Sequence, residues 1–221
     1  MAWETITLDC YGTLIDWEAG IGRAFAREAR RDGLELEPRR VVAIYHQVEP
    51  ELQAGAFRSY REILGEAALR VAARLGWRLP AERAGFLAAS LPDWPVFPDT
   101  RRALQRLGRR YQLAILSNVD DDLLAATLAR LGVRVDWTVT AEQVRSYKPG
   151  PAHFEAALRR LGGQGERLLH AAQSLFHDIR PASAAGLACA WVNRKREPLP
   201  ADLAPRHVVN DLNELAEVLG T

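Results

Sequence analysis

Cysteine and long apolar runs are scarce in this chain of 221 residues. The two cysteines, Cys10 and Cys189, are too few for a disulfide framework and form no C-x-x-C pair, so we expect both to be small buried side chains. No apolar stretch reaches membrane-spanning length, and the N-terminus shows no basic segment followed by an apolar one. We therefore expect a cytoplasmic protein with no membrane partner.

An excess of one charge is lacking as well, and so is lysine. The formal net charge is +1 at pH 7, which gives no reason to expect a nucleic-acid partner. Nearly all basic residues are arginines, and Lys148 and Lys195 are the only lysines. Because lysine supplies a compact point charge where arginine supplies a planar fork, each lysine is a candidate for a site that needs such a charge.

Short apolar runs and helical repeats alternate along most of the chain. The apolar runs predict strands at 4–10, 112–116, 135–140, 168–172, 189–192 and 207–209. Helical spacing and capping residues predict helices at 99–108, 120–131, 151–161, 178–185 and 210–219. Strands and helices that alternate in this way build right-handed βαβ units. The fold class we expect is α/β, with a Rossmann-like parallel sheet as the core.

Residues 16–94 break this alternation. Helical spacing predicts helices at 17–31, 38–52 and 58–75 and a short helix around 80–90. Three prolines within 91–98 predict an extended linker. We therefore expect an all-helical cap domain at 16–94, inserted into a core domain formed by 1–15 and 95–221.

Polar side chains stand where several predicted strands end, or in the loops beyond them. They are Asp9, Ser117, Asn118, Lys148, Gln173, Ser174 and Asp178. Since the carboxyl ends of parallel strands meet at one edge of a sheet, these groups can converge although they are distant in sequence. Each one alone also fits a helix cap, a turn or a solvated surface charge. Together with the α/β pattern, the set favours a catalytic site.

Four segments resemble, in order and spacing, the motifs of the haloacid dehalogenase superfamily. They are Asp9-Cys10-Tyr11-Gly12-Thr13-Leu14, Leu116-Ser117-Asn118, Tyr147-Lys148-Pro149 and Ser174…His177-Asp178. The resemblance covers essentially the whole chain, including a helical cap after the first motif. It implies a hydrolase in which Asp9 is the nucleophile and forms a covalent ester that water later cleaves.

The resemblance also implies catalytic roles for three other core residues. Lys148 would orient Asp9 and balance its charge. Asp178 would position Lys148 or the hydrolytic water. Ser174 belongs to the same motif and completes the expected catalytic set.

Substrate contacts are implied from both the core and the cap. Ser117-Asn118 would donate hydrogen bonds to a substrate carboxylate or phosphate, helped by backbone amides after Asp9. The dehalogenases use an arginine of the second cap helix to help accept the halide. His46 stands at that place here, and Arg58 or Arg61 in the next helix is a candidate substitute. The expected substrate-binding residues are Cys10, Tyr11, Thr13, His46, Arg61, Ser117 and Asn118.

Two positions separate the branches of this superfamily. Its phosphatases carry a second aspartate two residues after the nucleophile, as general acid and base, and another that helps to hold Mg²⁺. This chain has Tyr11 and Gln173 at those places. Mg²⁺ favours carboxylate and water ligands, so both replacements argue against phosphoryl transfer. A tyrosine after the nucleophile resembles the 2-haloacid dehalogenases, which displace halide without a metal.

We therefore expect an (S)-2-haloacid dehalogenase-like hydrolase that needs no cofactor and acts on a small anionic substrate. An Mg²⁺-dependent phosphatase is the first alternative. A non-catalytic protein that binds a small anion or a partner is the second. Apolar faces of the predicted cap helices suit a homodimer, and they equally suit packing of the helices against one another.

Overall fold

The computed structural model describes residues 3–221 and contains a six-stranded sheet in which all paired strands are parallel. The strands are β1 Thr5–Leu8, β2 Gln112–Ser117, β3 Trp137–Thr140, β4 Leu168–Ala172, β5 Ala188–Val192 and β6 His207–Val209. Their order in the sheet is β3-β2-β1-β4-β5-β6. Every residue of β1 and β4 is buried, as in the centre of a sheet covered on both faces.

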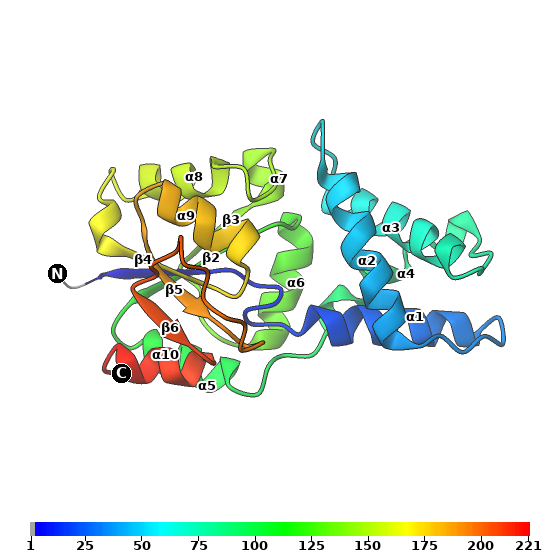
Figure 1. Cartoon of the computed structure of the whole chain (residues 1–221), viewed down its shortest axis with the longest axis horizontal. Helices are drawn as coiled ribbons and strands as arrows, with labels where there is room; N and C mark the ends of the chain where they lie inside the picture. Colours follow the sequence, from blue (N-terminus) through cyan, green and yellow to red (C-terminus); the bar gives the residue numbers. More distant parts are fainter. Residues whose placement is uncertain (1–2) are drawn as a thin grey trace.

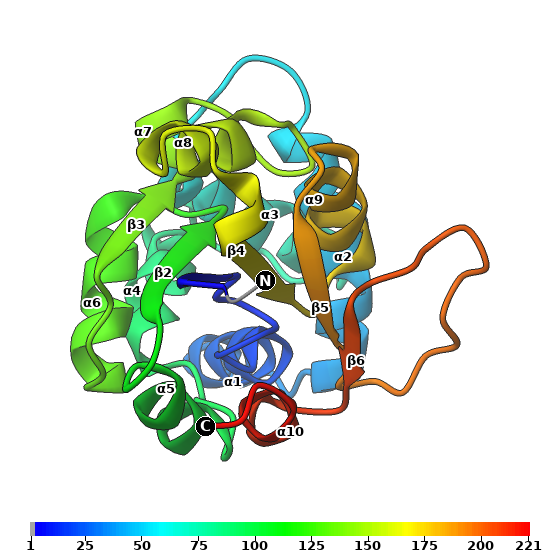
Figure 2. The same cartoon turned by 90° about the vertical axis from the view of Figure 1, so that its left-hand side faces the viewer.

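Helices cover both faces of this sheet, which confirms the α/β class. They are α5 Thr100–Leu107, α6 Asp121–Leu131, α7 Ala141–Val144, α8 Ala152–Arg160, α9 Arg180–Ala184 and α10 Leu212–Val218. Figure 2 shows α5, α6 and α10 on one side of the strands and α8 and α9 on the other. Each parallel crossover thus packs its helix back onto the sheet. The short helix α7 is absent from the sequence predictions; Thr140 caps it by accepting the Gln143 N–H.

The first strand ends at Leu8 rather than at residue 10 as predicted. The reason is a tight loop that closes on the Cys10 carbonyl, which accepts hydrogen bonds from the N–H groups of Leu14 and Ile15 at 2.8 and 3.0 Å. Asp9 therefore stands at the start of a loop beyond the sheet edge. The prediction for residues 135–136 was also wrong, since β3 begins at Trp137.

The four helices that lie between β1 and α5 form the right-hand body in Figure 1. They are α1 Trp17–Arg30, α2 Pro38–Gln53, α3 Tyr60–Arg74 and α4 Phe86–Ser90, with 3₁₀ turns at Ala81–Arg83 and Leu91–Asp93. The predicted helix at 80–90 is thus two pieces, and the predicted linker at 91–98 begins with a helical turn. We call this body the cap; its domain boundaries at 15/16 and 94/95 stay a prediction. None of the helices described in residues 3–221 is both long and apolar enough to cross a membrane.

The chain leaves the sheet for the cap and returns through two adjacent connections. The Asp16 N–H donates to the Pro95 carbonyl at 2.7 Å. Ile15 and Val96 form an antiparallel bridge. This pairing holds the cap directly beside the loop that carries Asp9.

Gly20 of α1 packs against the buried indole of Trp94, and a β-carbon at Gly20 would overlap that ring. We expect Gly20→Ala to lower the free energy of unfolding by about 1–3 kcal/mol, because moving the indole would break the hydrogen bond from Trp94 Nε1 to Ser90 Oγ at 3.0 Å. Gly65 of α3 has nothing within 4 Å of the same position, so Gly65→Ala is the matched control. It should raise the free energy of unfolding by about 0.5–1 kcal/mol. Urea denaturation measures both, and effects of the same sign would contradict the prediction.

Candidate active site

A cavity of about 370 Å³ lies where the cap meets the carboxyl ends of the central strands. Asp9, Ser117, Lys148 and Asp178 line it from the core, and the cap contributes residues of α1, α2 and α3. A larger groove of about 620 Å³ runs along α1, but its walls are mostly small and arginine side chains and include no buried acid beside a lysine. The smaller cavity is therefore the candidate active site.

Lys148 is the centre of this site. Its Nζ donates hydrogen bonds to Asp9 Oδ1 at 2.9 Å, to Asp178 Oδ1 at 2.6 Å and to the Leu116 carbonyl at 2.8 Å. The side chain is only 1% exposed, and all three N–H groups of its ammonium are occupied. Burial alone would lower the pKa of Lys148, but Asp178 and Asp9 raise it, so the ammonium stays charged.

Asp9 is held from two sides. Thr13 Oγ1 donates to Asp9 Oδ2 at 2.9 Å, while Lys148 holds the other carboxyl oxygen. Thr13 is itself fixed, because its hydroxyl oxygen accepts the Gln173 N–H at 3.0 Å. Burial raises the pKa of Asp9, and Lys148 and Thr13 act in the opposite direction. Two donors on its two oxygens suit the carboxylate form and fix its orientation toward the cavity.

Asp178 is anchored by a histidine that the sequence interpretation missed. His170 Nε2 lies 3.1 Å from Asp178 Oδ1, and His170 Nδ1 lies 2.9 Å from Thr7 Oγ1. Burial would raise the pKa of Asp178, but Lys148 and His170 hold it well below its usual range. Because that carboxylate only accepts, His170 Nε2 is the donor. The available signal was a histidine within the otherwise apolar run of β4, since a buried imidazole needs a partner.

Ser117 ends β2 and Asn118 follows it, and the two side chains are arranged differently. Ser117 lines the cavity, and its Oγ is buried and has no hydrogen-bond partner within residues 3–221. Asn118 instead clamps the lysine loop: its Nδ2 donates to the Lys148 carbonyl at 3.0 Å and its Oδ1 accepts the Lys148 N–H at 2.7 Å. Ser117 is thus placed to meet a substrate, whereas the Asn118 side chain mainly orients Lys148.

The loop after Asp9 presents backbone N–H groups and the Tyr11 side chain to the cavity. Cys10 is fully buried, so its thiol points away from the cavity, and the structure gives no acceptor for the Cys10 or Tyr11 N–H in the part of the chain that it describes. The Tyr11 ring lines the cavity, but its hydroxyl lies 2.9 Å from Thr127 Oγ1 on α6. The residue at the place of the phosphatases' general acid is therefore tied to a core helix.

Ser174 lies at the cavity wall and caps the turn that carries Asp178. Its Oγ accepts the His177 N–H at 3.0 Å, which starts a π-helical turn at Leu175–Ile179. The helix predicted to begin at Asp178 therefore begins earlier. This cap fixes the direction in which Asp178 enters the site.

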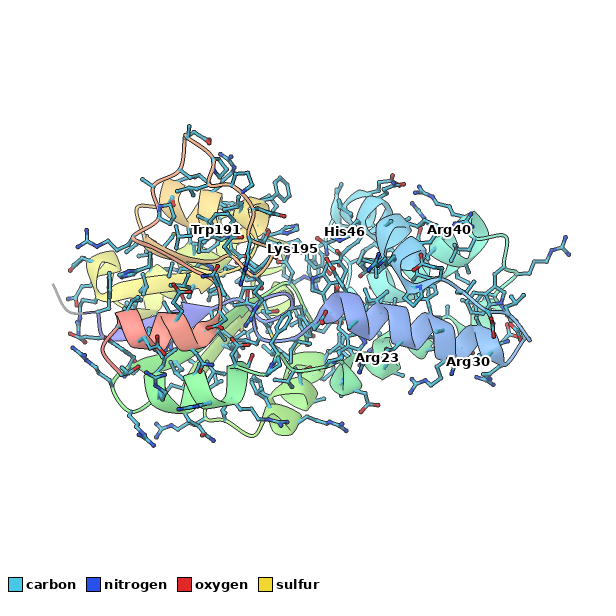
Figure 3. All side chains as sticks on the ribbon, turned by 60° about the horizontal axis from the view of Figure 1, so that its bottom comes forward. Arg23, Arg30, Arg40, His46, Trp191 and Lys195 are labelled. Atoms are coloured by element: carbon cyan, nitrogen blue, oxygen red, sulfur yellow. The ribbon has the colours of Figure 1, made fainter. Side chains whose placement is uncertain are left out.

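The cap side chains expected at the site have different positions. His46 lines the cavity, packs edge-on against Trp17 with ring centroids 4.8 Å apart, and places its Nε2 3.3 Å from Glu18 Oε1. Lys195 Nζ, from the loop after β5, lies 2.6 Å from the same Glu18 oxygen, so the bridge joins cap and core. Figure 3 shows His46 and Lys195 near each other at this junction. Hydrogen bonds from His46 and Lys195 lower the pKa of Glu18 to about 2.

Arg61 does not line the cavity, contrary to expectation. Asp120 at the start of α6 accepts the Tyr60 and Arg61 N–H groups at 2.7 and 2.8 Å and so fixes the first turn of α3 against the core. The Arg61 guanidinium then pairs at the surface with Asp122, at 2.5 Å. Arg61 is therefore not positioned to accept a leaving halide.

The side chains of the site do not form a set of ligands that suits a metal ion. Tyr11 and Gln173 occupy the places of the two phosphatase aspartates, and Lys148 lies between the two remaining carboxylates. Across residues 3–221, no three histidine, cysteine, aspartate or glutamate side chains cluster so as to hold a metal ion. The residues present do not resemble the carboxylate-rich shell that Mg²⁺ favours.

Comparison with known families agrees with this architecture. The model of the haloacid dehalogenase-like hydrolases matches residues 3–186. The chain belongs to this family. A haloacid dehalogenase-like hydrolase is an enzyme, so the alternative of a non-catalytic binding protein is set aside.

Relatives within the haloacid dehalogenase-like hydrolases differ in their reactions. (S)-2-haloacid dehalogenase 4A of Burkholderia cepacia is 29% identical over 220 residues, covering 96% of this chain and 92% of that protein. The crystal structure of a defluorinating L-2-haloacid dehalogenase superposes with a TM-score of 0.85 at 24% identity, covering 99% and 96% of the two chains. Glyceraldehyde 3-phosphate phosphatase of Methanothermobacter thermautotrophicus is 31% identical over 131 residues, covering 56% and 58%. Of these three similarities, the two that span nearly the whole chain are to haloacid dehalogenases, at modest identity.

Proposed function

We propose that this enzyme is a metal-independent hydrolase that displaces halide from small (S)-2-haloacids. The observation that supports this most is that the site holds an ionised nucleophile but offers no free Tyr11 hydroxyl to protonate a leaving group. Asp9 is held as a carboxylate by Lys148 and Thr13, while the Tyr11 hydroxyl is bound to Thr127, away from a reacting group. A departing halide needs no proton, whereas an alkoxide leaving a phosphate ester does.

The reaction has two steps in this proposal. A lone pair of an Asp9 carboxylate oxygen attacks C2 of the substrate, the carbon–halogen bond breaks, and the halide leaves with the bonding electrons. Water then attacks the carbonyl carbon of the resulting aspartyl ester. The bond between the Asp9 carbonyl carbon and the bridging oxygen breaks. A 2-hydroxy acid leaves, the Asp9 carboxylate is restored, and one proton is released.

The surrounding groups bind and orient in this scheme. The Ser117 hydroxyl and the N–H groups of Cys10 and Tyr11 would bind the substrate carboxylate. Lys148 would balance the charge of Asp9 before attack and of the oxyanion during ester cleavage. Asp178 would hold Lys148 and orient the water. His46 would lie on the halide side, in place of the arginine of the dehalogenases.

A halide-release assay with each enantiomer of 2-chloropropionate tests this function. We expect release from the (S) enantiomer, inversion to the (R)-hydroxy acid, and no loss of rate with EDTA, because no step uses a metal. The proposal fails if no short haloacid releases halide. Hydrolysis of an aryl phosphate that requires added Mg²⁺ would instead support the phosphatase alternative.

A further inference from the structure

A half-buried carboxylate on the cap wall of the cavity takes no part in the proposed chemistry. Glu49 belongs to α2, which lies on the side of the cap that faces the core (Figure 1). Glu49 Oε1 accepts hydrogen bonds from the Tyr45 hydroxyl at 2.9 Å and the Tyr60 hydroxyl at 2.7 Å. Both tyrosines are buried, and their hydroxyls lie 3.3 Å apart. The carboxylate is therefore held in one orientation.

The second oxygen of Glu49 is left for a ligand. No described residue donates a hydrogen bond to Glu49 Oε2, and this oxygen is not sealed inside the protein, since Glu49 lines the cavity. Glu49 also forms no ion pair with any residue of 3–221. A carboxylate with one oxygen fixed by two hydroxyls and the other open is a directed acceptor.

Of the acids buried in residues 3–221, all but Asp120 are bound by a cation, and Asp120 accepts two backbone N–H groups instead. Glu28 is bound by Arg83, Asp99 by Arg194, and Asp178 by Lys148. Burial raises the pKa of Glu49, and the hydrogen bonds from Tyr60 and Tyr45 offset only part of this effect. In Glu28, Arg83 and Arg31 outweigh the effect of burial and lower the pKa. Glu49 is thus a shielded acid whose compensating positive charge is absent from the described part of the chain.

The cavity as a whole has an excess of negative charge. Its lining contains four acids, namely Asp9, Glu49, Asp178 and Glu197, and two lysines, Lys148 and Lys195. Lys195 is already paired with Glu18 of the cap. A substrate with a second carboxylate near Glu49 would meet repulsion, whereas a protonated amine would supply the missing charge.

The opposite wall is suited to an anion. Ser117 lines the same cavity as Lys148, and its Oγ is buried and has no partner among the described residues. A cavity of about 370 Å³ lies within the range of sites for small organic ligands that extend beyond a short acid. The two walls together fit a molecule that is anionic at one end and cationic at the other.

We propose that Glu49, oriented by Tyr45 and Tyr60, binds the protonated amino group of the substrate, so that the substrate class is a small ω-amino acid carrying the leaving group beside its carboxylate. The placement of the carboxylate end rests on the proposed function. The amino subsite does not depend on which bond is broken. It makes Glu49 a specificity-determining residue.

Binding of unreactive ligands to the whole chain tests this subsite without any turnover. Isothermal titration calorimetry would compare 4-aminobutanoate, 5-aminopentanoate and 6-aminohexanoate with pentanoate, hexanoate and heptanoate, in which a methyl group replaces the ammonium. We expect at least one amino acid to bind about tenfold or more tightly than its alkanoate, because a charged hydrogen bond replaces an unpaired carboxylate. Adipate should bind most weakly.

Two variants make the result specific. Glu49→Gln should abolish the preference while keeping the fold, because the amide oxygen still accepts from both tyrosines. Glu51→Gln changes an exposed acid two residues further along α2 and should keep the preference. The proposal is overturned if the alkanoates bind as tightly as the amino acids in the wild type, or if the preference survives in Glu49→Gln. Since halide release is not measured, failure here leaves the proposed reaction untouched, and the reverse also holds.

Discussion

Replacing Asp9 by asparagine is expected to abolish halide release, by roughly 10⁴-fold or more, because no ester can form without the carboxylate nucleophile. The amide oxygen of the new side chain would still accept a hydrogen bond from Lys148 or Thr13, so the fold should persist. Initial rates of halide release, with the melting temperature of each variant, measure this. Asp122→Asn is the matched control, since Asp122 is an exposed acid in the first turn of α6.

A separate experiment with the wild-type enzyme shows which atom water attacks. In a single turnover in oxygen-18 water, the label should enter the Asp9 carboxylate and the first product should carry unlabelled oxygen. Mass spectrometry of the peptide that contains Asp9 reads this directly. Label in the first product would contradict an ester intermediate and would mean that water attacks the substrate carbon itself.

Lys148→Met should cost both activity and stability. The change leaves Asp9 and Asp178 as two buried carboxylates without their cation, and breaking such a pair costs about 3–5 kcal/mol of unfolding free energy. Halide release should be lost, because the carboxylate is neither oriented nor balanced. Urea denaturation at pH 8 measures the stability; Lys195→Met, which removes the half-exposed lysine, should cost no more than about 1 kcal/mol.

The stability loss in Lys148→Met should depend on pH. In the wild type, Lys148 and His170 lower the pKa of Asp178, so its contribution is present above the ordinary aspartate pKa and is lost only in strong acid. Without the ammonium, burial raises the pKa values of both carboxyls in the folded state above those in the unfolded state. The folded variant then binds more protons than the unfolded variant, so its unfolding free energy should rise as the pH falls. The difference in unfolding free energy between wild type and variant should therefore narrow from pH 8 to pH 5. An equal gap at both pH values would contradict this account.

The architecture was predictable because its signals are local. Apolar runs of β1, β2 and β4 alternate with capped helices, and the spacing allows only parallel crossovers. The break in this pattern after Asp16 located the helical insertion. The ends of elements were less well predicted, since they depend on contacts such as the Ser174 cap that shifts the turn before Asp178.

The sequence predicts which residues form the site better than it predicts which contacts they make. That Asp9, Lys148 and Asp178 meet follows from the sheet edge, and their roles stay predictions. That Asn118 clamps a loop does not follow, since it depends on tertiary position. The prediction that Arg61 faces the cavity failed because Asp120 of the core binds the first turn of α3, where Arg61 lies.

The position of Glu49 in the sequence also indicates a buried partner or a ligand. It lies on the face of α2 that also carries Tyr45 and Leu52, so an acid interrupts an otherwise apolar face. Such an interruption indicates either a buried partner or a ligand. Two tyrosines account for one oxygen only.

The paired connections at Asp16 and Pro95 have an evolutionary consequence. Because the two ends of the inserted segment lie side by side, helices of other lengths can replace it without altering the sheet. The groups proposed to break and form bonds then belong to one part of the chain, and Glu49, proposed to recognise the substrate, belongs to the other. Selection can therefore change what the enzyme accepts while the reacting groups, and the stability of the sheet that holds them, are inherited unchanged.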